Sequence, residues 1–119
     1  MKAIVQDRFG PPDVLQLADT GLPEAGAGDV LVRVHAAALN PADWHILRGD
    51  PLVARLMGVG LRPLPSRQNR EELLAVTGLI EDGKLTPVID RTYPLADTAE
   101  GLRHVEQGHA RGKVVVTVA

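Results

Sequence analysis

The stretch DVLVRVHAAALNPAD, residues 29–43, decides how this chain is expected to fold. Valines alternate with other residue types over residues 29–34, which places them on one face of an extended strand. A run of alanines follows, and then Pro41, which disfavours helical geometry at Asn40 but suits the first position of a helix. The stretch therefore predicts a strand over 29–34 and a helical turn beginning at Pro41.

On the N-terminal side of this stretch, the apolar pattern predicts an antiparallel pair of strands. Residues 2–5 make the first strand and residues 14–17 the second, and the sequence FGPP at 9–12 supplies a tight turn between them. A loop rich in glycine and proline, residues 21–28, then leads to the strand over 29–34.

On the C-terminal side, residues 49–65 show no sustained apolar period and are expected to form a loop or linker. The elements expected beyond it are recognised by residues that begin and end helices, and by apolar runs. They are a helix from Asn69 to Gly83 with an apolar stripe, a short strand at Val88–Ile89, a helix from Asp97 to Gly108, and a closing strand at Val114–Val118.

The composition of the chain excludes several classes of protein. With 119 residues, 45% of them hydrophobic, the chain is expected to form one small domain with its own core. A net charge of -2 without long blocks of one sign gives no indication of binding to nucleic acid or to a membrane. The lack of cysteine excludes a disulfide scaffold, a thiolate zinc site and a cysteine nucleophile. No signal peptide or membrane span is recognisable, so a cytoplasmic protein is expected.

Polar and aromatic side chains follow the predicted strand, where binding groups are often displayed. Asn40 and Asp43 can serve a site, or can simply satisfy the amides of a turn. Trp44, the single tryptophan, can stack on a flat substrate or belong to the core. His35 and His45 do not have the spacing of a zinc site and are expected to be structural or surface residues.

A second candidate is the basic loop GHARGK, residues 108–113. It places Arg111 and Lys113 beside glycines, an arrangement that suits a phosphate group. A solvated basic turn that complements the end of a helix explains it equally well. The sequence GVG at 58–60 is not a dinucleotide fingerprint, because the third glycine is missing and the prolines that follow prevent a helix.

Two long ordered motifs resemble a known family, the zinc-independent, NADPH-dependent quinone oxidoreductases of the medium-chain dehydrogenase/reductase superfamily. The first motif consists of MKAIV at 1–5 with the stretch at 29–43, and the second of LIEDGK at 79–84, PVIDRTYPL at 87–95 and GHARGKVV at 108–115. The resemblance covers residues 1 to about 60 and about 66 to 119. It implies an α+β fold, namely a partial GroES-like β-barrel, the alcohol dehydrogenase catalytic domain, with two packed helices and no Rossmann domain. The implied segments are an N-terminal part at 1–62, a junction at 63–68 and a C-terminal part at 69–119.

The resemblance also implies roles for individual residues. Asn40 stands where zinc-dependent relatives have a cysteine ligand, and Ala42 where they have a hydroxyl, so no zinc is expected. Asn40 and Trp44 are the implied substrate-binding residues, and the implied cofactor-binding residues are Asn40, Pro41, Arg111 and Lys113. Asp43 is expected to be a structural hydrogen-bonding residue of the barrel.

Members of the family that the chain resembles continue after residues such as 55–62 into a complete Rossmann domain. In this chain the second motif follows instead, so the segment that separates the two motifs in relatives is missing. No βαβ unit and no glycine-rich phosphate turn are expected in this chain. Two functions follow. One is NADPH-dependent hydride transfer to a small quinone or enone, with this chain inactive alone and binding NADPH weakly. The other is a non-catalytic binding or dimerisation module that forms homo-oligomers through exposed strand edges.

Overall fold

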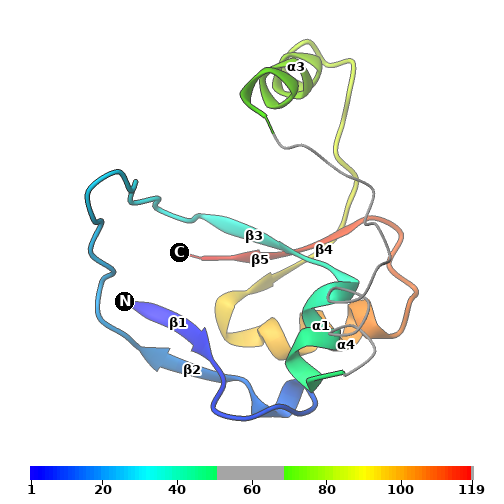
Figure 1. The fold of residues 1–119 in the computed structure, drawn as a ribbon. Helices are drawn as coiled ribbons and strands as arrows, with labels where there is room; N and C mark the ends of the chain where they lie inside the picture. The colour runs from blue at the N-terminus through cyan, green and yellow to red at the C-terminus, as the bar shows by residue number, and fades with distance from the viewer. Residues whose placement is uncertain (51–68, 119) are drawn as a thin grey trace, which may run out of the picture.

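The computed structural model describes residues 1–50 and 69–118, which form two sheets and three α-helices (Figure 1). The predicted junction at 63–68 and the sequence GVG at 58–60 lie outside these residues. The three α-helices are α1 (Pro41–Arg48), α3 (Arg70–Glu81) and α4 (Thr98–Glu106). Among them, none combines the length and the apolar character that a helix needs to cross a membrane.

The smaller sheet is the predicted antiparallel pair at the N-terminus. Strand β1 (Lys2–Val5) pairs with β2 (Gln16–Asp19), in a register that sets Lys2 opposite Asp19. The second strand begins later than predicted because the short 3-10 helix η1 (Pro12–Val14) turns the chain first and buries Val14. A proline at the first position of such a turn has the φ angle that the turn requires.

The larger sheet has the strand order β3-β5-β4, so that the last strand of the chain lies at its centre. Strand β5 (Lys113–Thr117) is antiparallel to β3 (Ala36–Leu39) and parallel to β4 (Ile89–Pro94). The last strand of the chain therefore pairs with a strand of the N-terminal half. Because α4 connects two parallel strands, the chain does contain one βαβ unit, contrary to the expectation. A short 3-10 helix, η2 (Leu95–Asp97), fills its strand-to-helix turn, which contains no glycine.

The prediction of a strand over residues 29–34 is wrong. The residues that pair with β5 are the alanines and Leu39 of β3, immediately after it. Val30, Val32 and Val34 are 84%, 68% and 50% exposed. A strand needs a neighbour that completes its ladder of hydrogen bonds, and within residues 1–50 and 69–118 no strand pairs with this segment.

Helix α1 begins where the proline predicted it. Pro41 is its first residue, and the Asp43 carboxylate accepts a hydrogen bond from the backbone N–H of Asn40 at 2.6 Å. The helix ends at Gly49, which has a φ of 67°. This left-handed conformation is the usual helix stop and favours glycine. Asp43 is thus a structural hydrogen-bonding residue, as expected, but at the start of α1 and not within a barrel.

Helix α3 has the predicted boundaries but not the predicted packing. Asn69 Oδ1 accepts a hydrogen bond from the backbone N–H of Glu72 at 2.8 Å, and Gly83 ends the helix with a φ of 68°. Figure 1 shows the helix standing away from both sheets. Its large apolar side chains are all at least 41% exposed, namely Leu73, Leu74, Val76, Leu79 and Ile80. The predicted helix that packs on a sheet is α4, which contacts the three strands of the larger sheet, and α1 packs on α4. Helix caps are local, whereas packing needs a partner surface.

The core lies between α1, α4 and the turn before β2. Val14, Leu47 and Leu102 are buried together, and Leu15, Leu39 and Trp44 pack around them. The two sheets share no hydrogen-bonded strand pair, so the strands described do not close into a barrel. The fold is a mixed α/β fragment, in agreement with the partial domain that the sequence predicted.

Candidate functional site

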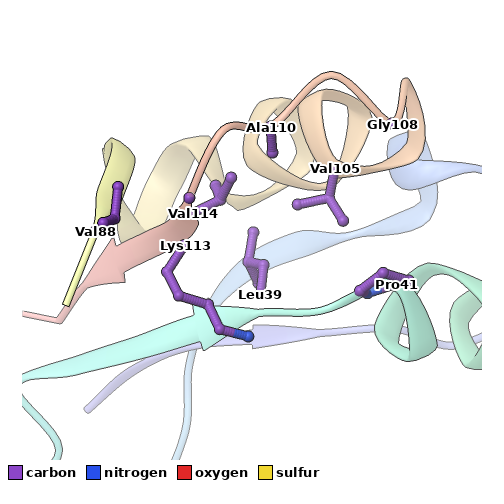
Figure 2. Close-up of a pocket in the computed structure, with 9 residues that line it drawn as sticks. Leu39, Pro41, Val88, Val105, Gly108, Ala110, Lys113 and Val114 are labelled. Atoms are coloured by element: carbon purple, nitrogen blue, oxygen red, sulfur yellow. The ribbon is translucent and has the colours of Figure 1, made fainter.

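A cleft of about 420 Å³ opens where β3 passes into α1, opposite the loop that leads from α4 into β5. This size is within the range of sites for small ligands. Figure 2 shows Leu39 and Pro41 on one side, and Val105, Gly108 and Ala110 on the other. The described residues that line the cleft are Leu39, Pro41, Val88, Val105, Gly108, Ala110, Gly112, Lys113 and Val114.

The register of β3 with β5 brings together the two polar side chains at the cleft. Leu39 pairs with Val114, so Asn40 and Lys113 are the next residues to face each other across the antiparallel strands. Lys113 Nζ donates a hydrogen bond to Asn40 Oδ1 at 2.7 Å. Lys113 is exposed and Asn40 is half-buried. The pair therefore presents one positive charge and one fixed carboxamide at the edge of an otherwise apolar cleft.

Two backbone segments that line the cleft, at Val88 and at residues 112–113, approach each other closely. The backbone N–H of Lys113 donates to Val88 O at 2.8 Å. A Cβ atom at Gly112 would lie 2.5 Å from the same oxygen, closer than side-chain carbon atoms come to backbone. Glycine at position 112 therefore permits the contact that starts β5 and sets the position of Lys113.

A histidine in the last turn of α4 contacts an aspartate of β4. His104 Nε2 lies 2.6 Å from Asp90 Oδ2, and the two side chains are only 13% and 19% exposed. The hydrogen bond from His104 lowers the pKa of Asp90, the charges of His104 and Arg91 and the backbone N–H of Arg111 lower it further, and partial burial opposes the change. No sequence pattern marks either residue, because they are 14 positions apart and meet only through the βαβ connection.

The structure brings together three of the five site residues predicted from the sequence. Pro41 and Lys113 line the cleft, and Asn40, which is not itself a lining residue, is hydrogen-bonded to Lys113. Arg111 belongs to the same loop but is not among the residues that line the cleft. Trp44 lies on α1 and packs against the core, with its ring stacked on that of His45 at a centroid distance of 3.5 Å. Trp44 is not a lining residue of the cleft as described.

Metal ligands are not gathered at the cleft. Within residues 1–50 and 69–118, no three histidine, aspartate or glutamate side chains lie close enough together to hold a metal ion. The Asn40 side-chain amide is hydrogen-bonded to Lys113.

Comparison with known proteins gives named relatives, all of which are much longer than this chain. Mouse NAD(P)H oxidoreductase RTN4IP1, mitochondrial, is 49% identical over 43 residues, which cover 36% of this chain and 11% of that protein. An alcohol dehydrogenase from Cupriavidus necator is 39% identical over 64 residues, or 54% of this chain and 17% of the relative. Trans-enoyl reductase poxH from Penicillium oxalicum is 29% identical over 105 residues, or 81% of this chain and 27% of the relative.

The chain thus spans about a tenth to a quarter of the length of these relatives. No solved structure matches it. The family model described as zinc-binding dehydrogenase matches residues 6–116, which include β2, almost all of the larger sheet, the three described helices and every described residue of the cleft. The chain therefore belongs to the zinc-binding dehydrogenase family of the medium-chain dehydrogenase/reductase superfamily.

Proposed function

We propose that this chain carries part of the catalytic domain of a zinc-independent, NADPH-dependent reductase that acts on quinones or enones. The observation that supports the proposal most is the Asn40–Lys113 pair at the edge of an apolar cleft. The names of the relatives, which include an NAD(P)H oxidoreductase and a trans-enoyl reductase, support the reaction class.

The residues of the cleft fit the nicotinamide end of the cofactor. A nicotinamide ring is flat and mostly apolar, and Leu39, Val105 and Val114 provide apolar surface of matching character. Its carboxamide needs hydrogen-bond partners, which Asn40 supplies with an amide that Lys113 holds in place. Bound NADPH supplies a hydride for an electron-poor C=C or quinone bond.

The positive charge of Lys113 has a separate role in the proposed site. Its ammonium group carries three protons, of which Asn40 accepts one. The others are available to an anionic group, such as a phosphate of the cofactor or a carbonyl oxygen that becomes negative during hydride transfer.

The residues present do not fit zinc. Structural and catalytic zinc sites use three or four cysteine, histidine or carboxylate ligands. The chain has no cysteine, and the part of it that the structure describes gathers no three of the remaining ligand types. We therefore derive no zinc-dependent step, despite the name of the family.

Binding of NADPH by this chain alone is expected to be weak. Lys113 is the one charged residue among those described at the cleft, and it is exposed. An exposed ion pair contributes about 0.2–1 kcal/mol, whereas a micromolar site needs about 8 kcal/mol. The chain alone is expected to bind NADPH no tighter than millimolar and to reduce a model quinone no faster than the background rate, because hydride transfer requires a firmly held nicotinamide.

Saturation-transfer NMR with millimolar NADPH tests the proposal. We expect transfer to the nicotinamide protons, and Lys113→Ala should weaken binding by about 1.4- to 5-fold, the equivalent of one exposed ion pair. The matched control is Lys84→Ala, because Lys84 is also exposed and pairs with Asp82 after α3. Equal binding by wild type and Lys113→Ala, or an equal loss in Lys84→Ala, would contradict the proposal.

The exposed apolar surface favours a second candidate, a non-catalytic dimerisation module. Strands β3 and β4 form the edges of the larger sheet, and the valines of 29–34 lie exposed before β3. Unpaired edges accept strands from other chains. The dimerisation module requires a defined dimer, which sedimentation at high protein concentration detects. It also requires that Lys113 does not respond to NADPH.

A further inference from the structure

The strand β4 has an irregularity at Asp90. Ile89 pairs with Lys113 and Arg91 pairs with Val114, so that Asp90 is an extra residue between two consecutive pairs. Such a β-bulge changes the direction of a side chain and often lies next to a functional site. Here the Asp90 carboxylate meets His104 in the last turn of α4, with 2.6 Å between Oδ2 and Nε2.

Because His104 lies in the last turn of α4, its contact with Asp90 holds against β4 the helix end that leads into the loop 108–112. On the other side of the loop, Lys113 pairs with Ile89, so both ends of the loop are held against β4 next to Asp90. This loop contributes three residues to the cleft and leads directly into Lys113.

Burial distinguishes this pair from the other ion pairs of residues 1–50 and 69–118. Both of its side chains are less than one-fifth exposed, whereas every other pair includes a side chain that is at least 29% exposed. Contacts made away from water are ordered more firmly than flexible surface pairs.

We infer that Asp90 and His104 are positioning residues, which hold the loop 108–112 so that Lys113 meets Asn40 at the cleft. The inference rests on the proposed function only for what the cleft binds. The position of the loop itself can be measured without a nucleotide. The inference gives a role to two residues that are not among those that line the cleft.

The electrostatics around Asp90 agree with this role. The charged groups near its carboxylate are His104 from α4 and Arg91 from its own strand. Their effect, together with the hydrogen bond from His104, lowers the pKa of Asp90. The side chain is thus a carboxylate at neutral pH, which can accept the hydrogen bond from His104.

The test compares four variants of the whole chain by amide hydrogen exchange and NMR. Asp90→Ala and His104→Ala remove the contact, whereas His104→Gln keeps a side-chain N–H that can reach the carboxylate. Asp82→Ala is the matched control, since Asp82 forms an exposed pair with Lys84 outside the cleft.

We expect Asp90→Ala and His104→Ala to accelerate exchange at the Arg111 and Gly112 amides by about tenfold through local opening of the loop. The Asn40 side-chain amide resonance should shift as well, and His104→Gln should restore both readouts. A role limited to global stability would change exchange throughout the chain and would leave the Asn40 resonance in place. If Asp90→Ala does not fold, the comparison of His104→Ala with His104→Gln tests the inference by itself.

The inference would be overturned if His104→Ala left the amide hydrogen exchange of the loop and the Asn40 resonance unchanged. An equal response in Asp82→Ala would overturn it as well. These readouts require no nucleotide. If wild type shows no response to NADPH while the loop behaves as expected, the proposed function fails and the positioning role stands.

Discussion

Lys113 Nζ donates a hydrogen bond to Asn40 Oδ1 at 2.7 Å, although the two residues are 73 positions apart. The contact follows from the antiparallel register that pairs Leu39 with Val114. Asn40 also precedes α1, and Lys113 begins the central strand of the larger sheet. The candidate site therefore depends on both halves of the chain, and substitutions that disturb either strand end should affect it.

Replacement of Asp43 by alanine should destabilise the protein by about 1 kcal/mol, as is usual for loss of a helix cap. The Asp43 carboxylate accepts the N–H of Asn40 at 2.6 Å, which fixes the start of α1. Urea denaturation measures the change. Asp29→Ala is the control, because Asp29 accepts a hydrogen bond from Gly26 within an exposed loop. Equal stability of the two variants would contradict the role of Asp43.

Alanine substitution at two glycines should have opposite effects on stability. At Gly112 the new Cβ would lie 2.5 Å from Val88 O, so Gly112→Ala should destabilise by about 1–3 kcal/mol, the usual cost of overpacking. At Gly78, within α3, a Cβ meets nothing within 4 Å, and Gly78→Ala should stabilise the helix by about 0.5–1 kcal/mol. Thermal denaturation of both variants checks the signs. A Gly112→Ala protein as stable as wild type would show that β4 and β5 do not approach as described.

The contribution of Asp90 to stability should be lost in acid. The pKa of Asp90 is lowered, first by the hydrogen bond from His104, so that ionised Asp90 stabilises the folded state. This contribution is complete above the ordinary aspartate pKa of about 3.9 and disappears as the pH falls through the lower value in the folded state. Asp90→Asn should therefore unfold at lower urea than wild type near neutral pH, and the difference should shrink below about pH 4. A difference that is constant or grows in acid would contradict the assignment.

Local signals in the sequence predicted the helices well. Pro41 and Asn69 begin α1 and α3 as expected, because a cap or an N-terminal proline acts within one turn of chain. The packing of α3 was not predictable in the same way. Its apolar stripe indicates which face is suited to burial, but only the presence of a neighbouring surface buries it.

The strand over 29–34 shows the same limit for sheets. Alternation of valines indicates two faces, but a strand forms only where another strand supplies the hydrogen bonds. The alanines of β3 carry little strand signal, yet they pair with β5 because their register places Leu39 against the buried Val114. The Asp90–His104 pair was missed for a related reason, since two residues joined by a βαβ connection have no characteristic spacing in sequence.

The proposed function depends most on the cleft beside Lys113 and Asn40 as the place where the nicotinamide end of NADPH binds. The most direct measurement is a titration of the isotope-labelled chain with NADPH up to millimolar concentration, followed through the backbone and side-chain amide resonances. We expect shifts at Leu39, Val105, Ala110, Lys113 and the Asn40 side chain, with β1, β2 and α3 unaffected, and weaker shifts in Lys113→Ala. Shifts confined to α3 or to the smaller sheet, or none at the cleft, would contradict it.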